Sequence, residues 1–170
     1  MLLHKLHVHL IYMHMHQLQA QVEFAAMDDE TLGTWRAFLS AHANVTRAIS
    51  RDLAAAGLPD LGWYDLLWSL YRQPERRLRV NELAREVALS PTAMSRFVDR
   101  VESAGYVRRE PDPADRRALQ ITITAAGVDA LRAMWPVYEK GIETHFAAAL
   151  GGSAARLRKM FERMSESARG

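Results

Sequence analysis

Residues 90–127 read SPTAMSRFVDRVESAGYVRREPDPADRRALQITITAAG, and this stretch decides the fold. Ser90 followed by Pro91 is a strong signal for the start of a helix, because serine caps the free N–H groups of the first turn and proline suits the first helical position. Two runs that favour extended backbone, 106–110 and 118–124, then flank a tip rich in proline and charge. The stretch therefore predicts one helix followed by a β-hairpin.

The helix that begins at Pro91 has an apolar and a polar face. Its apolar positions recur at spacings of three and four residues and are expected to be buried: Met94, Phe97, Val98 and Val101. The opposite face carries hydroxyl groups and charges: Thr92, Ser95, Arg96, Asp99 and Arg100. A short helix is expected directly before it, at 81–88. Two short helices joined by a tight turn are typical of a helix-turn-helix DNA reader.

This polar face has two interpretations. Serine and threonine are short enough for close approach inside a major groove, and Arg96 and Arg100 lie one turn apart, within reach of a guanine edge or a phosphate. The alternative is an ordinary solvated face on which Asp99 forms a local ion pair. The hairpin that follows favours the first interpretation.

The hairpin tip is stiffened by Pro111 and Pro113 and is flanked by four cations: Arg108, Arg109, Arg116 and Arg117. Asp115 precedes Arg117 by two residues, so in an extended chain both side chains point the same way. A carboxylate that holds a guanidinium in place lowers the entropy lost when arginine enters a narrow, negative minor groove. A solvated loop with a surface ion pair is the alternative. One alternating apolar face is expected to seat the hairpin on the core: Leu119, Ile121 and Ile123.

The composition excludes several kinds of site. Without any cysteine the chain has no disulfide, zinc-thiolate site or thiol switch. The formal net charge is only +2, so a surface for a polyanion must come from local clusters of arginine.

The sequence contains no nucleophile-elbow, phosphate-loop or His-Glu-x-x-His motif, which argues against an enzyme. No apolar run reaches the roughly 18 residues of a membrane helix, and no secretory signal is recognisable, so we expect a cytoplasmic protein without a membrane partner.

Residues 1–26 form a histidine-rich extension, either a docking arm or a dispensable tail. Its histidines are spaced so that few of them share one face of a helix: His4, His7, His9, His14 and His16. No cysteine accompanies them, so we expect neither a physiological metal site nor a cofactor. A metal-binding or protein-docking module remains the alternative to a DNA reader.

Residues 78–127 resemble the winged helix-turn-helix core of MarR-type transcription regulators. The wing of that family reads Asp-Pro-x-Asp-Arg-Arg, and its next strand ends in Leu-Thr-x-x-Gly. Ile123 replaces the leucine, and the other motif positions match: Asp112, Pro113, Asp115, Arg116, Arg117, Thr124 and Gly127. The resemblance extends more loosely over 30–167. It implies a mainly α fold with a small β-hairpin wing and long N- and C-terminal dimerisation helices.

The resemblance also divides the chain into parts. After the extension at 1–26, it implies a first dimerisation helix with its connection at 27–61, a winged helix-turn-helix DNA-binding core at 62–124, and C-terminal dimerisation helices at 125–170. The implied protein is a homodimer on a palindromic double-stranded DNA operator. Such a regulator usually represses its genes until a small ligand binds.

The resemblance further assigns roles to residues. It implies that Arg117 enters the minor groove and that Asp115 orients it. It also implies contacts with the major groove and backbone from one group: Ser90, Thr92, Ser95 and Arg96. Arg100 joins them from the polar helix face and Arg116 from the wing motif. A small effector, aromatic or otherwise, is expected between the dimer helices and the reading head, with this candidate lining: Trp35, Phe38, His42, Trp63 and Leu67.

Overall fold

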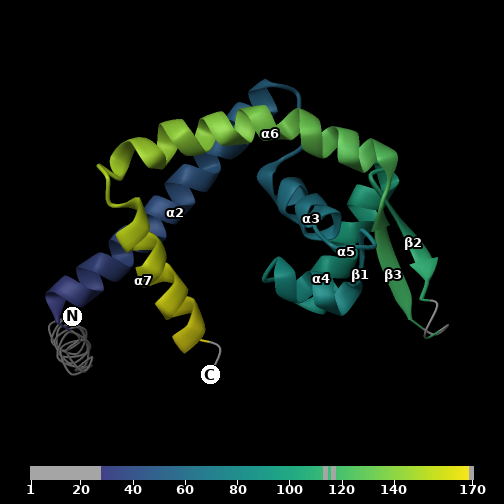
Figure 1. The fold of residues 1–170 in the computed structure, drawn as a ribbon, viewed down its shortest axis with the longest axis horizontal. Helices are drawn as coiled ribbons and strands as arrows, with labels where there is room; N and C mark the ends of the chain where they lie inside the picture. The colour runs from purple at the N-terminus through teal and green to yellow at the C-terminus, as the bar shows by residue number, and fades with distance from the viewer. Residues whose placement is uncertain (1–27, 113–114, 116–117, 169–170) are drawn as a thin grey trace, which may run out of the picture. The chain divides into compact units, whose positions relative to one another are not determined.

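The computed structural model describes residues 28–112, 115 and 118–168. The chain divides into two compact units, Met1–Ala41 and His42–Gly170, and helix α2 (Asp29–Ala55) runs from the first into the second (Figure 1). The histidine-rich extension predicted at 1–26 lies outside the described residues, and the two interpretations of it stay open.

The first unit contributes the start of α2. The Asp28 carboxylate accepts a hydrogen bond from the Thr31 amide at 2.7 Å and so caps the helix. The rings of Trp35 and Phe38 stack with their centroids 5.7 Å apart. Both aromatic residues had been predicted to line a ligand site, and here they contact each other.

The second unit contains the end of α2, further helices and one small sheet. In chain order these elements are α3 (Leu61–Tyr71), β1 (Arg77–Arg79), α4 (Val80–Glu86), α5 (Pro91–Ser103), β2 (Val107–Pro111), β3 (Leu119–Ile123), α6 (Ala125–His145), the 3-10 helix η1 (Ala147–Ala149) and α7 (Ala154–Ser167). The predicted fold class, mainly α with a small β-hairpin wing, is confirmed.

The sheet joins the hairpin to an earlier strand. Its order is β1-β3-β2, all antiparallel, with Leu78 opposite Ile121. The sequence predicted the hairpin, but not its pairing with β1. Ile121 and Ile123 are buried as predicted. The prediction for Leu119 is wrong, because this residue pairs with Pro111 beyond the end of β1 and its side chain is 49 % exposed.

The core of the second unit covers one face of α5. The apolar positions predicted on this helix are all buried: Met94, Phe97, Val98 and Val101. Trp63 of α3 meets Phe97 edge-on, with ring centroids 6.4 Å apart, and Tyr106 in the same way at 5.7 Å. Leu67, one turn further along α3, is completely buried. These contacts fix α5 by its apolar face and leave its polar face exposed.

The junction between β3 and α6 gives a physical reason for the Thr-x-x-Gly motif. The Thr124 hydroxyl accepts a hydrogen bond from the Gly127 amide at 3.1 Å and donates to the Gly105 carbonyl at 2.7 Å. The Thr124 amide donates to the Tyr106 carbonyl at 3.0 Å. A Cβ atom on Gly127 would overlap that carbonyl oxygen and lie 2.8 Å from Cγ1 of Ile123. The motif therefore ties the end of the wing to the turn that follows α5.

Candidate nucleic-acid interface

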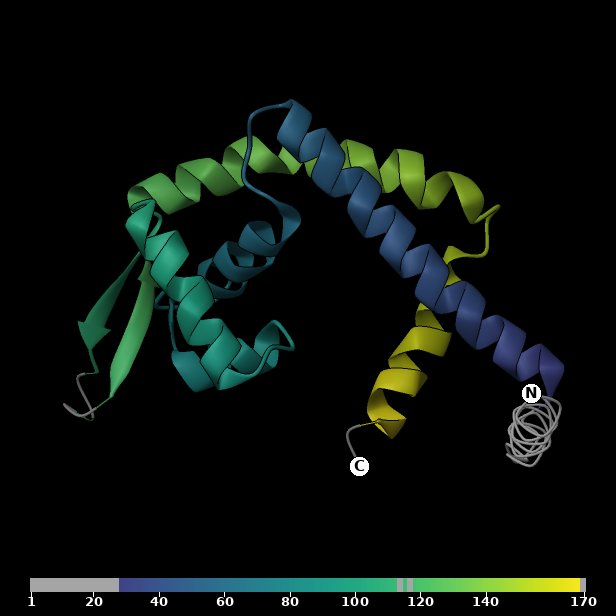
Figure 2. The same cartoon turned by 180° about the vertical axis from the view of Figure 1, so that it is seen from behind.

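Helix α5 lies beside the β2–β3 hairpin (Figure 2). The Ser90 hydroxyl caps this helix by accepting a hydrogen bond from the Ala93 amide at 3.2 Å. Thr92, Ser95 and Arg96 are exposed on the face. Within the described part of the chain, the Arg96 side chain makes no hydrogen bond or ion pair. The first two turns of α5 thus offer hydroxyl groups and one available guanidinium.

Arg109 of β2 joins the wing to α5. Its Nη2 lies 2.6 Å from Oδ1 of Asp99 and donates to the Ser95 carbonyl at 3.3 Å. Its Nη1 pairs with Glu102, whose carboxylate also accepts the Arg109 amide hydrogen at 2.8 Å. The Arg109 side chain is only 22 % exposed, so these contacts are partly shielded from solvent. One side chain therefore connects wing and helix and offsets two negative charges on α5.

The local ion pair expected for Asp99 exists, but its partner comes from the wing and not from the helix. This matters for the polar face, because an uncompensated carboxylate beside Arg96 would repel phosphate. Arg100 behaves differently, since its guanidinium lies over the Phe97 ring, 5.1 Å from the centroid. Such a contact at an exposed site contributes roughly 0.5–1 kcal/mol, which leaves Arg100 able to exchange it for a phosphate.

A buried acid lies where β2 ends and the tip of the wing begins. Asp112 is 2 % exposed, and its Oδ2 accepts a hydrogen bond from Nε of Arg79 at 2.6 Å. This hydrogen bond and the charge of Asp112 raise the pKa of Arg79. The Asp112 amide donates to the Ala118 carbonyl at 3.0 Å, and the Ala118 amide donates to the Asp115 carbonyl at 2.8 Å. The ion pair thus connects the wing to β1, which forms the opposite edge of the sheet from β2.

The tip itself is described only in part. Asp115 is exposed, and its backbone belongs to the turn just described. Arg116 and Arg117 lie outside the described residues, so the orientation of Arg117 by Asp115 stays a prediction.

The face of the sheet turned away from Arg109 carries a second polar network. Arg108 donates from Nε to Glu110 at 2.8 Å, and the Thr122 hydroxyl donates to the same carboxylate at 2.6 Å. These hydrogen bonds, that of Thr122 first, hold the pKa of Glu110 below its usual range. Alternation along β2 therefore gives its two arginines opposite directions, with Arg108 turned away from α5 and Arg109 toward it.

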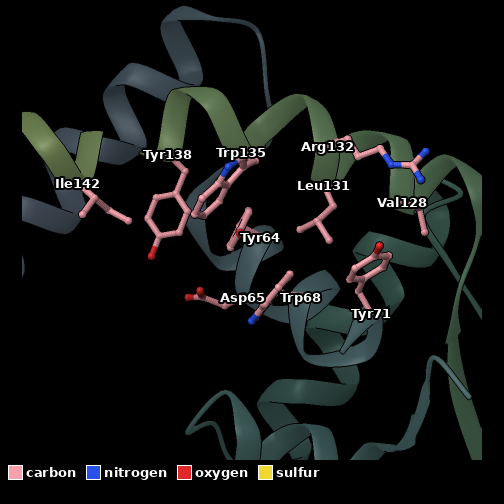
Figure 3. A pocket seen from close by; sticks show the side chains of 10 residues that line it. All are labelled: Tyr64, Asp65, Trp68, Tyr71, Val128, Leu131, Arg132, Trp135, Tyr138 and Ile142. Atoms are coloured by element: carbon pink, nitrogen blue, oxygen red, sulfur yellow. The ribbon is translucent and has the colours of Figure 1, made fainter. Parts of the chain in front are cut away.

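A hollow of about 590 Å³ lies between α3 and α6 (Figure 3). Its walls are mainly aromatic: Tyr64, Trp68, Tyr71, Trp135 and Tyr138. Two charged residues border it, Asp65 from α3 and Arg132 from α6. Its volume is within the range of small-molecule sites, roughly 300–1,000 Å³.

None of the five residues predicted to line a ligand site borders this hollow. Trp63 and Leu67 point into the core on the other face of α3, and His42 is exposed. Trp35 and Phe38 belong to the first unit. Both faces of α3 carry aromatic or leucine side chains, so periodicity alone did not distinguish the face that packs inward from the face that lines the hollow.

Comparison with known proteins shows which family this chain resembles. The MarR family model matches residues 56–118, from the residue after α2 to the residue before β3. The transcriptional regulator PrsX of Escherichia coli is 31 % identical over 80 residues, which are 47 % of this chain and 48 % of PrsX. The chain spans about half the length, or less, of the first curated relatives it matches.

Solved structures extend the similarity along the chain. AbsC, a MarR family transcriptional regulator from Streptomyces coelicolor, is 28 % identical with a TM-score of 0.77, over 85 % of this chain and 98 % of AbsC. Sco3205, a MarR family regulator from the same organism solved in complex with DNA, is 28 % identical with a TM-score of 0.75, over 84 % and 90 % of the two chains. The winged-helix core and the fold of this chain thus match those of MarR family transcription regulators.

Sequence reasoning missed the roles of Arg109 and Asp112. Arg109 had been counted only as one of the cations near the tip. Its place opposite Ile121 in the sheet gives the missing signal, because paired residues share a face and Ile121 faces the core. Asp112 had been noted only as a motif position, and its burial depends on Arg79, which is 33 residues away in sequence.

The described part of the chain contains no helix with the length and apolar character needed to cross a bilayer. In the same part, the histidine and acidic side chains form no group of three or more arranged to hold a metal ion.

Proposed function

We propose that the protein is a sequence-specific, double-stranded-DNA-binding transcription regulator that uses α5 in the major groove and the wing in the minor groove. The observation that carries this proposal is the Arg109 contact with Asp99 and Glu102, which holds the reading helix and the wing as one unit. A two-part reader needs this rigidity, since each part must meet its groove at the same time.

The proposed contacts follow from the exposed groups. Ser90, Thr92 and Ser95 supply short donors and acceptors, and Arg96 supplies a long one for a guanine edge or a phosphate. Arg100 would bind a phosphate after leaving the Phe97 ring. In the wing, Arg116 and Arg117 would enter or border the minor groove, with Asp115 as the orienting carboxylate.

We further propose that the regulator is a homodimer on a palindromic operator. Helix α7 supports this, because no side chain in it is buried although it carries a row of apolar residues. Met160 and Met164 are 39 % and 48 % exposed. The segments 27–61 and 125–170 would then supply the dimerisation helices, and 62–124 the DNA-binding core. A C2 dimer matches the symmetry of a palindrome.

Repression relieved by a small ligand completes the proposal, with the aromatic hollow between α3 and α6 as the effector site. The hollow is bounded by α6 and by α3, and α3 packs on α5 through Trp63 and Phe97. A ligand that separates α3 from α6 would therefore change the position of the reading helix. The protein would act as a regulator and not as an enzyme.

The test is a gel-shift titration against the palindrome nearest to the gene, at several salt concentrations. A regulator should lose affinity steeply with salt and keep a preference for the palindrome over scrambled DNA. Arg96→Ala and Arg117→Ala should each weaken the complex by about tenfold, because each removes a contact of roughly 1–3 kcal/mol. Arg47→Ala, which removes an exposed cation of α2, is the matched control.

Equal binding of the palindrome and the scrambled duplex would contradict the proposal. A protein that binds neither duplex, while it remains folded and dimeric, would favour the alternative of a docking module.

A further inference from the structure

We propose that the hollow between α3 and α6 binds an organic cation, an ammonium group on an aromatic or alkyl scaffold, with its positive charge among the rings beside Asp65. This inference rests on the proposed function, in which the same hollow is the effector site. It adds the chemical class of the ligand.

The rings form a box contributed by two helices (Figure 3). Tyr64 is at its centre, with its ring centroid 4.6 Å from Tyr138, 6.3 Å from Trp135 and 6.3 Å from Trp68. The Tyr64 and Tyr138 rings are tilted by 59°, whereas the Trp135 and Tyr138 rings are nearly perpendicular at 83°. Aromatic rings from both helices, set at different angles, therefore line the hollow. The faces of indole and phenol rings attract cations, and such cages recognise quaternary ammonium groups.

Two of these rings are also more exposed than large aromatic side chains usually are. Trp68 is 46 % and Trp135 is 44 % exposed, and both border the hollow. A ligand that covers them would gain apolar burial in addition to the electrostatic attraction. The hollow therefore favours a ligand that is both apolar and positively charged.

The charges around the hollow are unevenly placed. Asp65 lies at the end that holds the Trp68 and Tyr138 rings, and it is the carboxylate among the lining residues. Arg132 lies at the other end, beside Tyr71 (Figure 3), and its guanidinium is already 3.3 Å from the carboxylate of Asp129. A ligand among the rings would therefore meet a negative countercharge before a positive one.

At the end of the hollow that holds Asp65, the pKa values of the ionisable groups are raised, which disfavours their negatively charged forms. Burial first, then Tyr138 and Asp65, raise the pKa of Tyr64 to about 12. Burial and Asp65 raise the pKa of Tyr138, and burial and Asp60 raise the pKa of Asp65 itself. A carboxylate or phenolate ligand would meet the same unfavourable environment, whereas a cation would stabilise the ionised Asp65.

Calorimetric titration of the full protein with three small probes tests this inference. The probes are benzyltrimethylammonium, benzyl alcohol and benzoate, which share a benzyl or phenyl ring and differ in charge. We expect the cation to bind at least tenfold more tightly than the other two. Asp65→Asn should weaken cation binding by about tenfold and leave benzyl alcohol unchanged, because only the countercharge is removed.

Two further variants serve as matched controls. Arg132→Gln, at the other end of the hollow, should leave cation binding unchanged or slightly tighter. Trp135→Leu should weaken it, because a flat π face is replaced by an alkyl group. Asp65→Asn is conservative and lies at an exposed position, so it keeps the test valid if the tryptophan variant fails to fold.

Gel shifts with the same proteins, without any probe, separate this inference from the proposed function. If wild type and Asp65→Asn bind the operator equally, but benzoate or benzyl alcohol binds as tightly as the cation, the cation site is overturned and the regulator stands. Absence of any probe binding with intact DNA binding overturns it too. Cation binding that depends on Asp65, in a protein that binds no DNA, would leave the site and remove the proposed function.

Discussion

Arg79 donates a hydrogen bond from Nε to the carboxylate of Asp112 at 2.6 Å, and this ion pair connects β1 to the end of β2, where the tip of the wing begins. The two partners are unequal in exposure, 44 % for Arg79 and 2 % for Asp112. A carboxylate this deeply buried is stable only while it is paired and hydrogen-bonded. Since Asp112 also begins the turn that leads into the tip, the pair determines where the tip starts.

Asp112→Asn should therefore destabilise the wing. The substitution keeps the shape but removes the charge that Arg79 balances, and we expect a loss of about 1–3 kcal/mol in the free energy of unfolding. This loss is smaller than the one expected for a fully buried ion pair, because Arg79 remains half-exposed. Urea unfolding measures the change. Asp129→Asn removes an acid that is 72 % exposed in its ion pair, so a loss of the same size there would refute the role of burial.

Arg109→Gln should separate the reading helix from the wing. The glutamine cannot reach both acids, so Asp99 and Glu102 lose their shared partner, and we expect a cost of about 1–3 kcal/mol in unfolding free energy. If the protein is a DNA reader, its affinity for the palindrome should fall by about tenfold as well, since two negative charges are released beside Arg96.

Arg108→Gln provides the matched control on the neighbouring residue. Arg108 is 57 % exposed and pairs with Glu110 on the opposite face of the sheet, so its removal should cost no more than about 1 kcal/mol. Equal effects of the two substitutions on operator binding would mean that loss of charge matters, and not the link between wing and helix.

Local signals in the sequence predicted much of the fold. Ser90 and Pro91 gave the start of α5 because a cap and a first-turn proline act within one turn of helix. Alternation predicted the burial of Ile121 and Ile123, but it also included Leu119, since the pattern contains no information on where the supporting strand β1 ends.

The rest depends on contacts that form only when whole elements pack together. Arg109 and Glu102 are close in sequence, yet their contact requires β2 to fold back along α5. The lining of the hollow required knowledge of which face of α3 meets α6: the adjacent residues Trp63 and Tyr64 both pack in the core, and of the two Tyr64 borders the hollow. Apolar spacing alone does not choose between the two faces of such a helix.

Tyr64 gives a pH-dependent prediction. Its pKa is raised from 10.0 to about 12 by burial first, and then by Tyr138 and Asp65. Because the folded state favours the neutral phenol, this contribution to stability is fully present below pH 10 and is lost as the pH rises from 10 toward 12. Unfolding experiments across that interval measure the loss, and ultraviolet absorbance of tyrosinate reports the titration.

Two variants assign this titration. Tyr64→Phe should remove the late-titrating phenol, and Asp65→Asn should lower the pKa of Tyr64, because one neighbouring negative charge is absent. A late phase that persists in Tyr64→Phe would assign it to Tyr138, whose pKa is also raised.

Gly127→Ala should destabilise the protein although alanine favours helices. Its methyl group would overlap the Tyr106 carbonyl oxygen and press on Ile123, so either the Thr124 cap or the end of β3 must shift. We expect a net loss of about 1–3 kcal/mol, measured by urea unfolding. Gly33→Ala is the matched control in α2, where an added Cβ meets nothing within 4 Å, and it should stabilise the helix by roughly 1 kcal/mol. Opposite signs for the two substitutions would establish close packing, and not helix propensity, as the reason for glycine at the β3–α6 junction, whereas a gain from both would disprove it.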